Sequence, residues 1–475
     1  MNRLKNKTKI VATLGPASTD LATLENMIRS GLNVCRLNFS HGKHDDLVDV
    51  IKHIRAFNHR FGTHVSILAD LQGPKIRIGK VAGGSVELKD GSTVRIVTEE
   101  QESTAEQLFI NYQDFIKDVE VGERILIDDG KLMLEITEVA DQHASAKVLY
   151  GGPLSSNKGV NLPNTKLSLP CLTEKDMADL EFALEHDIPW IGLSFVRSAD
   201  DIRELQEIIR KSGRQSKVVA KIEKPEAVED LDEIIKVSDA LMVARGDLGV
   251  EVPMEEVPLI QKKIVKKCRR MCKPVIIATQ MMESMVTNIS PTRAEVNDVA
   301  NAVMDGADAV MLSGETSVGN HPVEVIKAMY KIIVHTEQFK GLYYKDGRRP
   351  GSKERIISDA LCRSACELAE TIKVRGIVTM TFSGYTAQRV ASYRPDALIF
   401  VFTGNQELLS RLSLIWGVRG FYYDKFVSTD HTIEDIKSML KEQEFVDPGD
   451  HLIHLASMPI SDRGTTNMMK LSAVV

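Results

Sequence analysis

The sequence predicts an α/β protein in three parts: a closed (β/α)8 TIM barrel, a small β-barrel domain inserted into it, and a C-terminal α/β domain. Three observations lead to this prediction. A short apolar run followed by a longer amphipathic stretch occurs eight times. One block of short alternating segments interrupts the series. After the eighth unit, a charged stretch at 345–353 precedes further apolar runs at 376–380 and 398–402.

The eight apolar runs are the predicted barrel strands. Nearly all of their residues are apolar or β-branched, as expected of parallel strands buried on both faces. Helical patterns lie between them, and one opens with Thr173 and Asp176 at capping-box spacing. The runs lie at 8–15, 33–40, 64–71, 189–196, 217–223, 240–248, 274–280 and 309–314.

Eight successive strand–helix units fit a closed barrel better than an open sheet. An open doubly wound fold is the alternative. It is weakened because no Gly-x-Gly-x-x-Gly turn follows the first run.

The interruption lies between Leu71 and Pro170. Its segments alternate in polarity and are separated by turn residues such as Gly83-Gly84, which is typical of short strands. We therefore expect an inserted β-rich domain there. The predicted segments are 85–88, 93–97, 124–127, 132–137 and 146–149, and the predicted domains are 1–70, 71–169, 170–343 and 344–475.

Composition argues against several classes of protein. A net charge of −6 and a pI of about 6.1 disfavour a nucleic-acid binder. The apolar runs are far shorter than the ~20 residues of a membrane span, and the N-terminus lacks the apolar core of a secretory signal. Six scattered cysteines, without histidines at zinc spacing, indicate reduced packing thiols in a cytoplasmic protein rather than metal ligands.

Polar side chains stand at the ends of the predicted strands. Strand ends of such barrels meet at one face, where active sites lie, so these side chains should converge. They are Arg36, Asn38, Ser40, Asp70, Lys221, Glu223, Arg245, Asp247, Thr279, Gln280, Ser313 and Glu315.

Lys221, Glu223 and Asp247 form the predicted centre of this face. Strand alternation puts Lys221 and Glu223 on the same side. Glu223 and Asp247, on neighbouring strands, can hold one hard divalent cation together with substrate oxygens and water, as Mg²⁺ is usually held. The alternative is a structural ion-pair network. So many polar ends on apolar strands would cost much desolvation without a ligand, which favours a metal-assisted phosphoryl-transfer site.

Six motifs, in order, resemble the signatures of pyruvate kinases. The resemblance spans essentially the whole chain, and the ordered set is far more specific than its Lys-Ile-Glu step alone. It implies a cytoplasmic, homotetrameric kinase of glycolysis that acts on phosphoenolpyruvate and ADP. The motifs are NVCRLNFSHG at 33–42, AKIE at 220–223, MVARGDLGVE at 242–251, ATQMMESM at 278–285, PTRAE at 291–295 and MLSGE at 311–315.

The resemblance also implies roles for individual residues. Glu223 and Asp247 would bind Mg²⁺ (or Mn²⁺), and Lys221 would stabilise the transferring phosphoryl group. The implied catalytic residues are Lys221, Arg36 and Thr279; the substrate contacts are Arg36, Lys221, Gly246, Asp247 and Thr279; the nucleotide contacts are Asn38, Phe39, Ser40, His41, Arg77 and Lys158. No single proton donor to the enolate stands out, and Thr279 or Ser313, acting through water, are candidates.

The third strand departs from the family pattern. Many relatives read Asp-Thr-Lys-Gly-Pro-Glu-Ile-Arg after it, whereas this chain reads DLQGPKIR over 70–77. Relatives hold K⁺ at the positions of Asn38, Ser40, Asp70 and Leu71. Lys75 replaces their glutamate, and its ammonium could take the place of K⁺ and would repel it. We expect K⁺ not to be required; the alternative is that Lys75 faces solvent and the potassium site survives.

A loop in the C-terminal domain offers a further candidate site. Thr381, Ser383, Gly384 and Thr386 precede a predicted helix, where hydroxyls and backbone amides can cradle phosphate. The loop resembles the effector loop where relatives bind a sugar phosphate or a nucleotide such as AMP. Some relatives have arginine at the position of Tyr385, and an ordinary N-cap turn is an equal alternative.

Two rival functions are a Mg²⁺-dependent lyase or aldolase acting on pyruvate enolate and a non-catalytic binding protein of the same fold. The lyase would not need Lys221, Arg36, Lys158 or the inserted domain, which the resemblance implies closes over the site as a lid. The binding protein would be expected to have lost a metal carboxylate or the lysine, and all are present.

Overall fold

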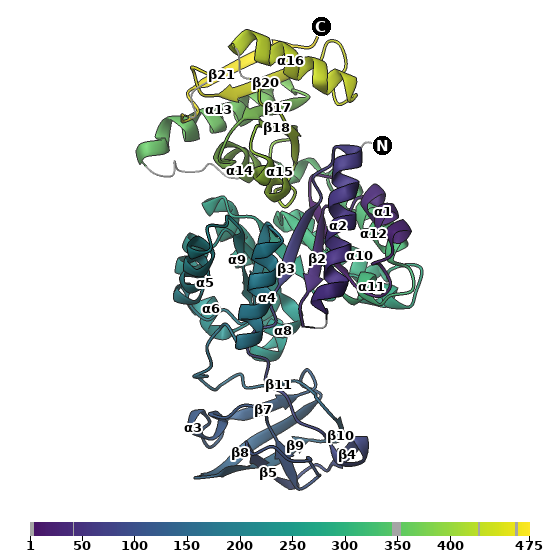
Figure 1. The fold of residues 1–475 in the computed structure, drawn as a ribbon, viewed down its shortest axis with the longest axis vertical. Helices are drawn as coiled ribbons and strands as arrows, with labels where there is room; N and C mark the ends of the chain where they lie inside the picture. Colours follow the sequence, from purple (N-terminus) through teal and green to yellow (C-terminus); the bar gives the residue numbers. More distant parts are fainter. Residues whose placement is uncertain (1–3, 41, 344–352, 426–427, 461–463) are drawn as a thin grey trace.

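The computed structural model describes residues 4–40, 42–343, 353–425, 428–460 and 464–475. Figure 1 shows three parts along the long axis: the C-terminal domain at one end, the barrel in the middle and the β-rich insertion at the other end. Among the described residues, no helix has the length and apolarity to cross a bilayer.

Eight parallel strands close into a barrel, as predicted, in the order β1-β16-β15-β14-β13-β12-β3-β2. Their apolar side chains form the cores inside and outside the ring. The strands are β1 (Lys9–Leu14), β2 (Val34–Asn38), β3 (Ser66–Asp70), β12 (Trp190–Leu193), β13 (Lys217–Ile222), β14 (Ala240–Ala244), β15 (Val275–Ala278) and β16 (Ala309–Leu312).

Helices surround this ring (Figure 1). The capping box predicted at Thr173 is confirmed, since Thr173 and Asp176 each accept the other's backbone N–H. The helices are α1 (Leu21–Ser30), α2 (His44–Phe61), α4 (Glu174–Glu185), α5 (Ala199–Lys211), α6 (Pro225–Glu229), α7 (Leu231–Val237), α8 (Arg245–Glu251), α9 (Val257–Met271), α10 (Arg293–Asp305), α11 (Gly314–Ser317) and α12 (Pro322–Thr336).

One predicted strand includes the start of a helix. The apolar run 240–248 contains both β14 and the first half of α8, which begins at Arg245. The strand ends where its partner ends, because Ala244 pairs with Ala278, the last residue of β15. Leu248 extends the apolar run because it is a buried residue of α8, not a residue of a strand.

The insertion folds as a separate, mostly β-sheet domain around its own apolar core. Its strands pair as a six-stranded sheet, β11-β7-β8-β9-β5-β6, and a two-stranded sheet, β10-β4, rather than as one continuous ring. All five predicted segments are strands, and the short β6, β10 and β11 were missed. The elements are β4 (Ser85–Leu88), β5 (Thr93–Val97), β6 (Gln107–Phe109), α3 (Phe115–Asp118), β7 (Arg124–Ile127), β8 (Leu132–Ala140), β9 (His143–Tyr150), β10 (Gly152–Ser155) and β11 (Val160–Asn161).

The C-terminal domain is a five-stranded sheet in the order β19-β18-β17-β20-β21, with β21 antiparallel. Helices lie on its two faces (Figure 1). The charged stretch 345–353 falls almost wholly outside the described residues. The elements are α13 (Ile356–Ile372), β17 (Gly376–Met380), α14 (Tyr385–Ser392), β18 (Leu398–Thr403), α15 (Gln406–Leu412), β19 (Val418–Tyr422), α16 (Thr429–Glu442), β20 (His451–Ala456) and β21 (Met468–Ala473).

Candidate active site

A chain of alternating charges runs across the carboxyl ends of β2, β3 and β13. The Arg36 Nε donates to Asp70 Oδ2 at 2.6 Å, and the Lys221 Nζ lies 3.1 Å from Asp70 Oδ1. The same ammonium lies 2.9 Å from Glu223 Oε1. Lys221 and Glu223 therefore share one side of the strand, as alternation predicted.

Backbone and hydroxyl groups fix the ends of this chain. The Phe195 N–H donates to Glu223 Oε2 at 2.8 Å. Lys221 also donates to Ser194 Oγ at 2.6 Å, and that hydroxyl donates to the Leu71 carbonyl at 2.7 Å. Ser194 had no role in the sequence analysis, although it lies inside the predicted fourth strand. Its contact with the lysine depends on packing between strands.

Burial and charge shift the pKa values of these groups in different directions. Burial raises the pKa of Asp70, but Lys221 and Arg36 outweigh it and the pKa lies below its ordinary value. Burial lowers the pKa of Lys221, but Asp70 and Glu223 outweigh it and the pKa is raised. The pKa of Glu223 is raised by burial and by the nearby Asp247 carboxylate, despite Lys221.

Asp247 lies in the first turn of α8, close enough to Glu223 for the two carboxylates to repel. This pair fits a hard divalent cation, because a cation between them would relieve that repulsion. Among the described residues, no cluster of three or more His, Cys, Asp or Glu side chains could hold a metal. A cation bound here would therefore complete its shell with substrate and water, which is the usual environment of Mg²⁺.

The start of α8 is held against the end of β15. The Gly246 N–H donates to Thr279 Oγ1 at 2.7 Å, and that hydroxyl donates to the Ala278 carbonyl at 2.6 Å. Thr279 and Gln280 have positive φ angles of 68° and 53°. Such angles are uncommon outside glycine and mark functional sites, so this turn is the strained part of the candidate site.

Two charged strand-end residues serve the scaffold. Arg245 donates to the Thr279 carbonyl at 2.7 Å and pairs with Asp298 at 2.7 Å. Glu315 is fully buried and accepts the backbone N–H groups of Met282 and Ser313. Each supports the turns that carry the site, and their charges are satisfied inside the protein.

The predicted nucleotide contacts are dispersed. Asn38 Oδ1 accepts the Ser40 N–H at 3.1 Å beside the charged chain. Phe39 is fully buried among apolar residues, so its side chain cannot contact a ligand. His41 lies outside the described residues. In the insertion, Arg77 donates to the Asn157 carbonyl at 2.9 Å and Lys158 pairs with Asp128 at 2.8 Å.

The insertion and barrel meet at a small cavity of ≈ 40 Å³, whose lining includes Lys75 and Asp247. Lys75 is exposed, and no contact joins it to Asn38, Ser40, Asp70 or Leu71 among the described residues. Its side chain instead approaches Gly159 of the insertion. The structure thus places Lys75 at the cleft rather than against Asp70, and the potassium requirement stays a prediction.

Close to this cavity, a hydrogen bond from the insertion reaches a buried ion pair of the barrel. Lys224 lies 2.7 Å from Glu251 Oε1, and Asn161 of β11 donates to the same oxygen at 2.8 Å. The second oxygen, Glu251 Oε2, is buried without a hydrogen-bond partner. No local sequence pattern predicts this contact, since its members lie on three separate segments.

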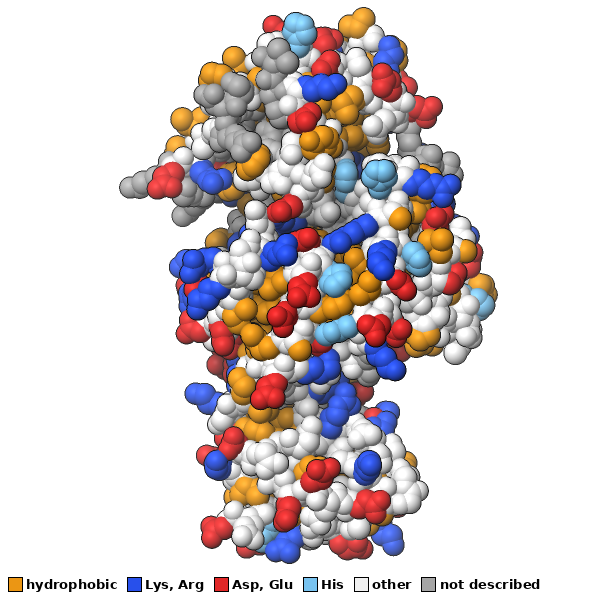
Figure 2. Space-filling view, in the orientation of Figure 1, with side chains coloured by type: hydrophobic (Ala, Val, Ile, Leu, Met, Phe, Trp, Pro, Cys, Tyr) orange, Lys and Arg blue, Asp and Glu red, His pale blue; other side chains and the backbone are white. Residues whose placement is uncertain are grey.

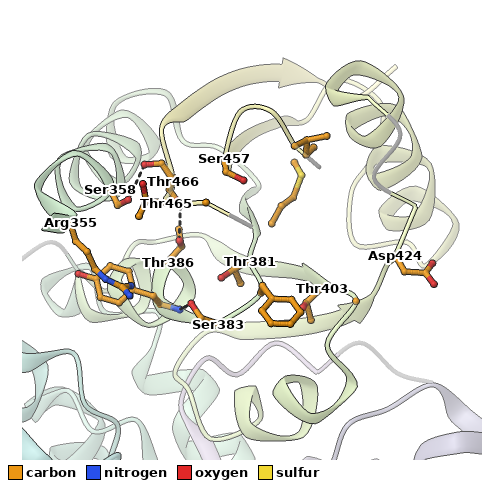
Figure 3. A pocket seen from close by; sticks show the side chains of 16 residues that line it. Arg355, Ser358, Thr381, Ser383, Thr386, Thr403, Asp424, Ser457, Thr465 and Thr466 are labelled. Carbon is orange, nitrogen blue, oxygen red and sulfur yellow. Dashed lines mark hydrogen bonds between the residues drawn. The ribbon is translucent and has the colours of Figure 1, made fainter. Parts of the chain in front are cut away.

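The C-terminal loop opens into a much larger cavity of ≈ 540 Å³. Figure 3 shows hydroxyl side chains, among them Thr381, Ser383 and Thr386, around the hollow. Thr381 Oγ1 accepts the Gly384 N–H at 3.0 Å, which closes the turn before α14. Thr386 is buried, and its hydroxyl is bonded to Thr466 at 2.8 Å.

The six cysteines are all free thiols. Cys272 is half-buried and the other five are buried. Among the described residues, none of them belongs to a group of three or more candidate metal ligands.

Comparisons with known proteins agree with this architecture. The family model described as "Pyruvate kinase, barrel domain" matches residues 5–326, and "Pyruvate kinase, alpha/beta domain" matches residues 359–472. A pyruvate kinase of Geobacillus stearothermophilus is 44% identical over 99% of this chain and 81% of its own length. One of Corynebacterium glutamicum is 43% identical over 98% of this chain and 97% of its own.

A solved structure is also similar to this chain. It is a pyruvate kinase from Cryptosporidium parvum, with a TM-score of 0.92 and 34% sequence identity. The match covers 99% of this chain and 96% of that one.

Proposed function

The chain belongs to the pyruvate kinase family and is a phosphotransferase, and on that premise we propose the site at which it moves the phosphoryl group of phosphoenolpyruvate to ADP. This is the carboxyl face of the barrel around Lys221. The observation that carries the proposal is the buried chain of Arg36, Asp70, Lys221 and Glu223, with Asp247 beside it.

The charge balance of this face supports the assignment. Two cationic and three anionic side chains meet there, so the face alone carries a net negative charge. An anionic substrate would be repelled unless a divalent cation joined it. Glu223 and Asp247 would hold Mg²⁺ or Mn²⁺, which supplies charge neutralisation to the phosphoryl oxygens and to the enolate. Phosphoryl transfer asks the protein mainly for such positioning and neutralisation.

The chain's own residues then have distinct tasks. Arg36 meets the phosphate, and Lys221, held in one position by Ser194, Asp70 and Glu223, neutralises the charge that develops on the moving group. The Gly246 N–H and Thr279 lie at the start of α8, where backbone amides favour the substrate carboxylate. Because the Thr279 hydroxyl already donates to Ala278, its main task is to hold this turn. Proton delivery through water near Thr279 or Ser313 remains part of the proposal.

The nucleotide would lie between the barrel and the insertion. Asn38 and Ser40 on the barrel side, with Arg77 and Lys158 on the insertion side, would bind the phosphates of ADP or ATP. The position of Lys158 supports this role, since its side chain is 35% exposed and can exchange its partner Asp128 for a phosphate. The insertion would act as a lid over the bound nucleotide.

A monovalent cation is not required in this proposal. Each oxygen of Asp70 already faces a fixed cation, Arg36 or Lys221. Lys75 adds a further positive charge at the cleft, which would lower the affinity for K⁺ in its surroundings. Its exposure means that any closer approach to Asp70 depends on lid movement.

The ≈ 540 Å³ cavity is the proposed effector site, with Thr381, Ser383, Gly384 and Thr386 at the phosphate end. The proposed ligand is a sugar phosphate or AMP, and Arg355 in the same lining supplies a positive charge.

A place in glycolysis, a cytoplasmic location and a homotetrameric assembly complete the proposal, since family membership favours each. Mass measurement by light scattering tests the assembly.

The decisive experiment is pyruvate formation from phosphoenolpyruvate with and without ADP. The proposal expects strict dependence on ADP and on Mg²⁺, which a lyase or aldolase would not show. In Lys221→Met, kcat should fall by about 10²–10³-fold, as for loss of one preorganised charge stabiliser. Lys217→Met, at the other end of β13, is the matched control and should keep its activity. Wild-type turnover in Lys221→Met would overturn the assignment.

A further inference from the structure

A second cavity, of ≈ 190 Å³, lies between the barrel and the C-terminal domain, at the end of the barrel opposite the candidate active site. It is lined by α2, by the loops before β12 and β13, and by α15. In Figure 2, basic side chains with a few acidic ones cover this junction, on the face that carries α2 and α4. The hollow is therefore built jointly by two domains.

Three arginines line this cavity: Arg55 from α2, Arg214 from the loop before β13 and Arg411 from α15. Arg55 donates to the carbonyl of His186 and has no carboxylate partner among the described residues. Arg214 pairs with Asp187. The lining holds two carboxylates, Asp187 and Glu407, against the three arginines, so one positive charge is in excess, which a bound anion would offset.

Arg411 is the most buried of the three. Its side chain is 13% exposed, whereas that of its partner Glu407, at 3.0 Å, is 61% exposed. Both of its contacts, to Glu407 and to Gln215 at 3.4 Å, use the same Nη2 atom. The Nε and Nη1 groups have no hydrogen-bond partner among the described residues. Burial keeps the pKa of Arg411 below its ordinary value, despite Glu407 and Asp239.

We propose that this cavity binds a small phosphate-bearing anion, with Arg411 as its central ligand and Arg55 and Arg214 beside it. Planar guanidinium groups suit the geometry of phosphate oxygens. The two lining carboxylates, Asp187 and Glu407, are both more than half exposed and can turn to water when an anion enters. The volume is well below the ≈ 540 Å³ of the loop cavity, which favours orthophosphate or a short phosphomonoester over a nucleotide.

The test is amide hydrogen exchange of the full chain with orthophosphate or glycerol 3-phosphate as the probe. Exchange in the segment 213–216 and in α15 should slow by about tenfold when the probe is at about ten times its dissociation constant. Arg411→Met should abolish this protection. Arg55→Gln, a substitution at an exposed residue, should reduce it. Arg60→Gln, on α2 but outside the cavity, should leave it unchanged.

Two controls separate this cavity from the other phosphate sites. Ser383→Glu places a negative charge in the loop cavity and should not alter protection at 213–216. Lys221→Met should not alter it either. The proposal is overturned if neither probe protects these segments, if protection persists in Arg411→Met, or if Ser383→Glu removes it. Protection by orthophosphate alone would identify inorganic phosphate as the ligand, and stronger protection by glycerol 3-phosphate would identify an ester.

Discussion

One ammonium group, that of Lys221, lies between two buried carboxylates, Asp70 and Glu223. Such a network could serve structure alone, because buried charges must be paired wherever they occur. Its excess of negative charge and the raised pKa of Glu223 argue otherwise. A divalent cation and an anionic substrate would together balance the charges around Lys221, as a phosphoryl-transfer site requires.

The role of Lys75 leads to a prediction about potassium. The wild-type protein should turn over in potassium-free buffer with an inert counter-cation, because Arg36 and Lys221 already face Asp70 and Lys75 adds a further fixed positive charge at the cleft. In Lys75→Glu, activity without K⁺ should fall by about tenfold, equivalent to about 1.4 kcal/mol of lost charge stabilisation, and K⁺ should restore it. Lys80→Glu makes the same charge change away from the cleft and should not respond to K⁺. Near-zero wild-type activity that K⁺ restores would refute this account.

Asp70 should make stability depend on pH. Its pKa is lowered in the folded state, so its ionised form stabilises the protein above the ordinary value of 3.8. That contribution is lost as pH falls through 3.8 towards the folded-state pKa. Asp70→Asn removes the carboxylate partner of Arg36 and leaves Lys221 with Glu223 alone, and it should cost about 3–5 kcal/mol at neutral pH. Thermal unfolding from pH 7 to pH 3 should show a constant Tm difference that narrows only at the acid end.

At the scale of elements, the site depends on where strands give way to helices. The end of β15 takes up positive φ at Thr279 and Gln280, and α8 begins with its Gly246 N–H on the Thr279 hydroxyl. Backbone conformation thus holds the start of α8 against the end of β15. The loop before α14 repeats this arrangement, since Gly384 has a φ of 84° and its N–H is bonded to Thr381.

The loop before α14 can be tested without disturbing the barrel. Ser383 is exposed in the ≈ 540 Å³ cavity, so Ser383→Glu adds a charge that repels phosphate while leaving packing intact. Activation by a sugar phosphate or AMP should disappear, with basal kcat unchanged. Ser383→Gln, of similar size but neutral, should keep part of it. Equal activation curves for Ser383→Glu and wild type would show that the loop is an ordinary helix cap.

At the scale of the molecule, the insertion and the barrel have separate cores and meet at a few polar contacts. The cavity of ≈ 40 Å³ at their junction is far smaller than the several hundred Å³ of usual ligand pockets, so the proposed binding of a nucleotide there requires the insertion to move. The domain limits at 70, 169 and 343 remain a prediction.

A substitution at Asn161 tests this movement of the insertion. Asn161→Asp replaces the donor to Glu251 with a second carboxylate, which should cost the docked lid about 1–3 kcal/mol. We expect KM for ADP to rise and kcat to fall, so that kcat/KM for ADP falls by about 5–150-fold, the equivalent of that free energy, with KM for phosphoenolpyruvate nearly unchanged. Asn26→Asp, exposed on α1, controls for net charge. Equal rises in both KM values would mean that the contact serves barrel stability rather than the lid.

The sequence by itself determined the eight-stranded barrel, the insertion, the C-terminal domain and the convergence of Lys221 and Glu223. These follow from periodicity along single segments, and strand alternation alone sets the side on which Lys221 and Glu223 lie. Only the tertiary structure decided that Ser194 orients Lys221, that Arg245 and Glu315 support turns, that Phe39 is buried and that Lys75 faces the cleft. Each of these outcomes depends on packing between segments that are distant in the chain. A local sequence pattern does not predict which atoms of two such segments will be in contact.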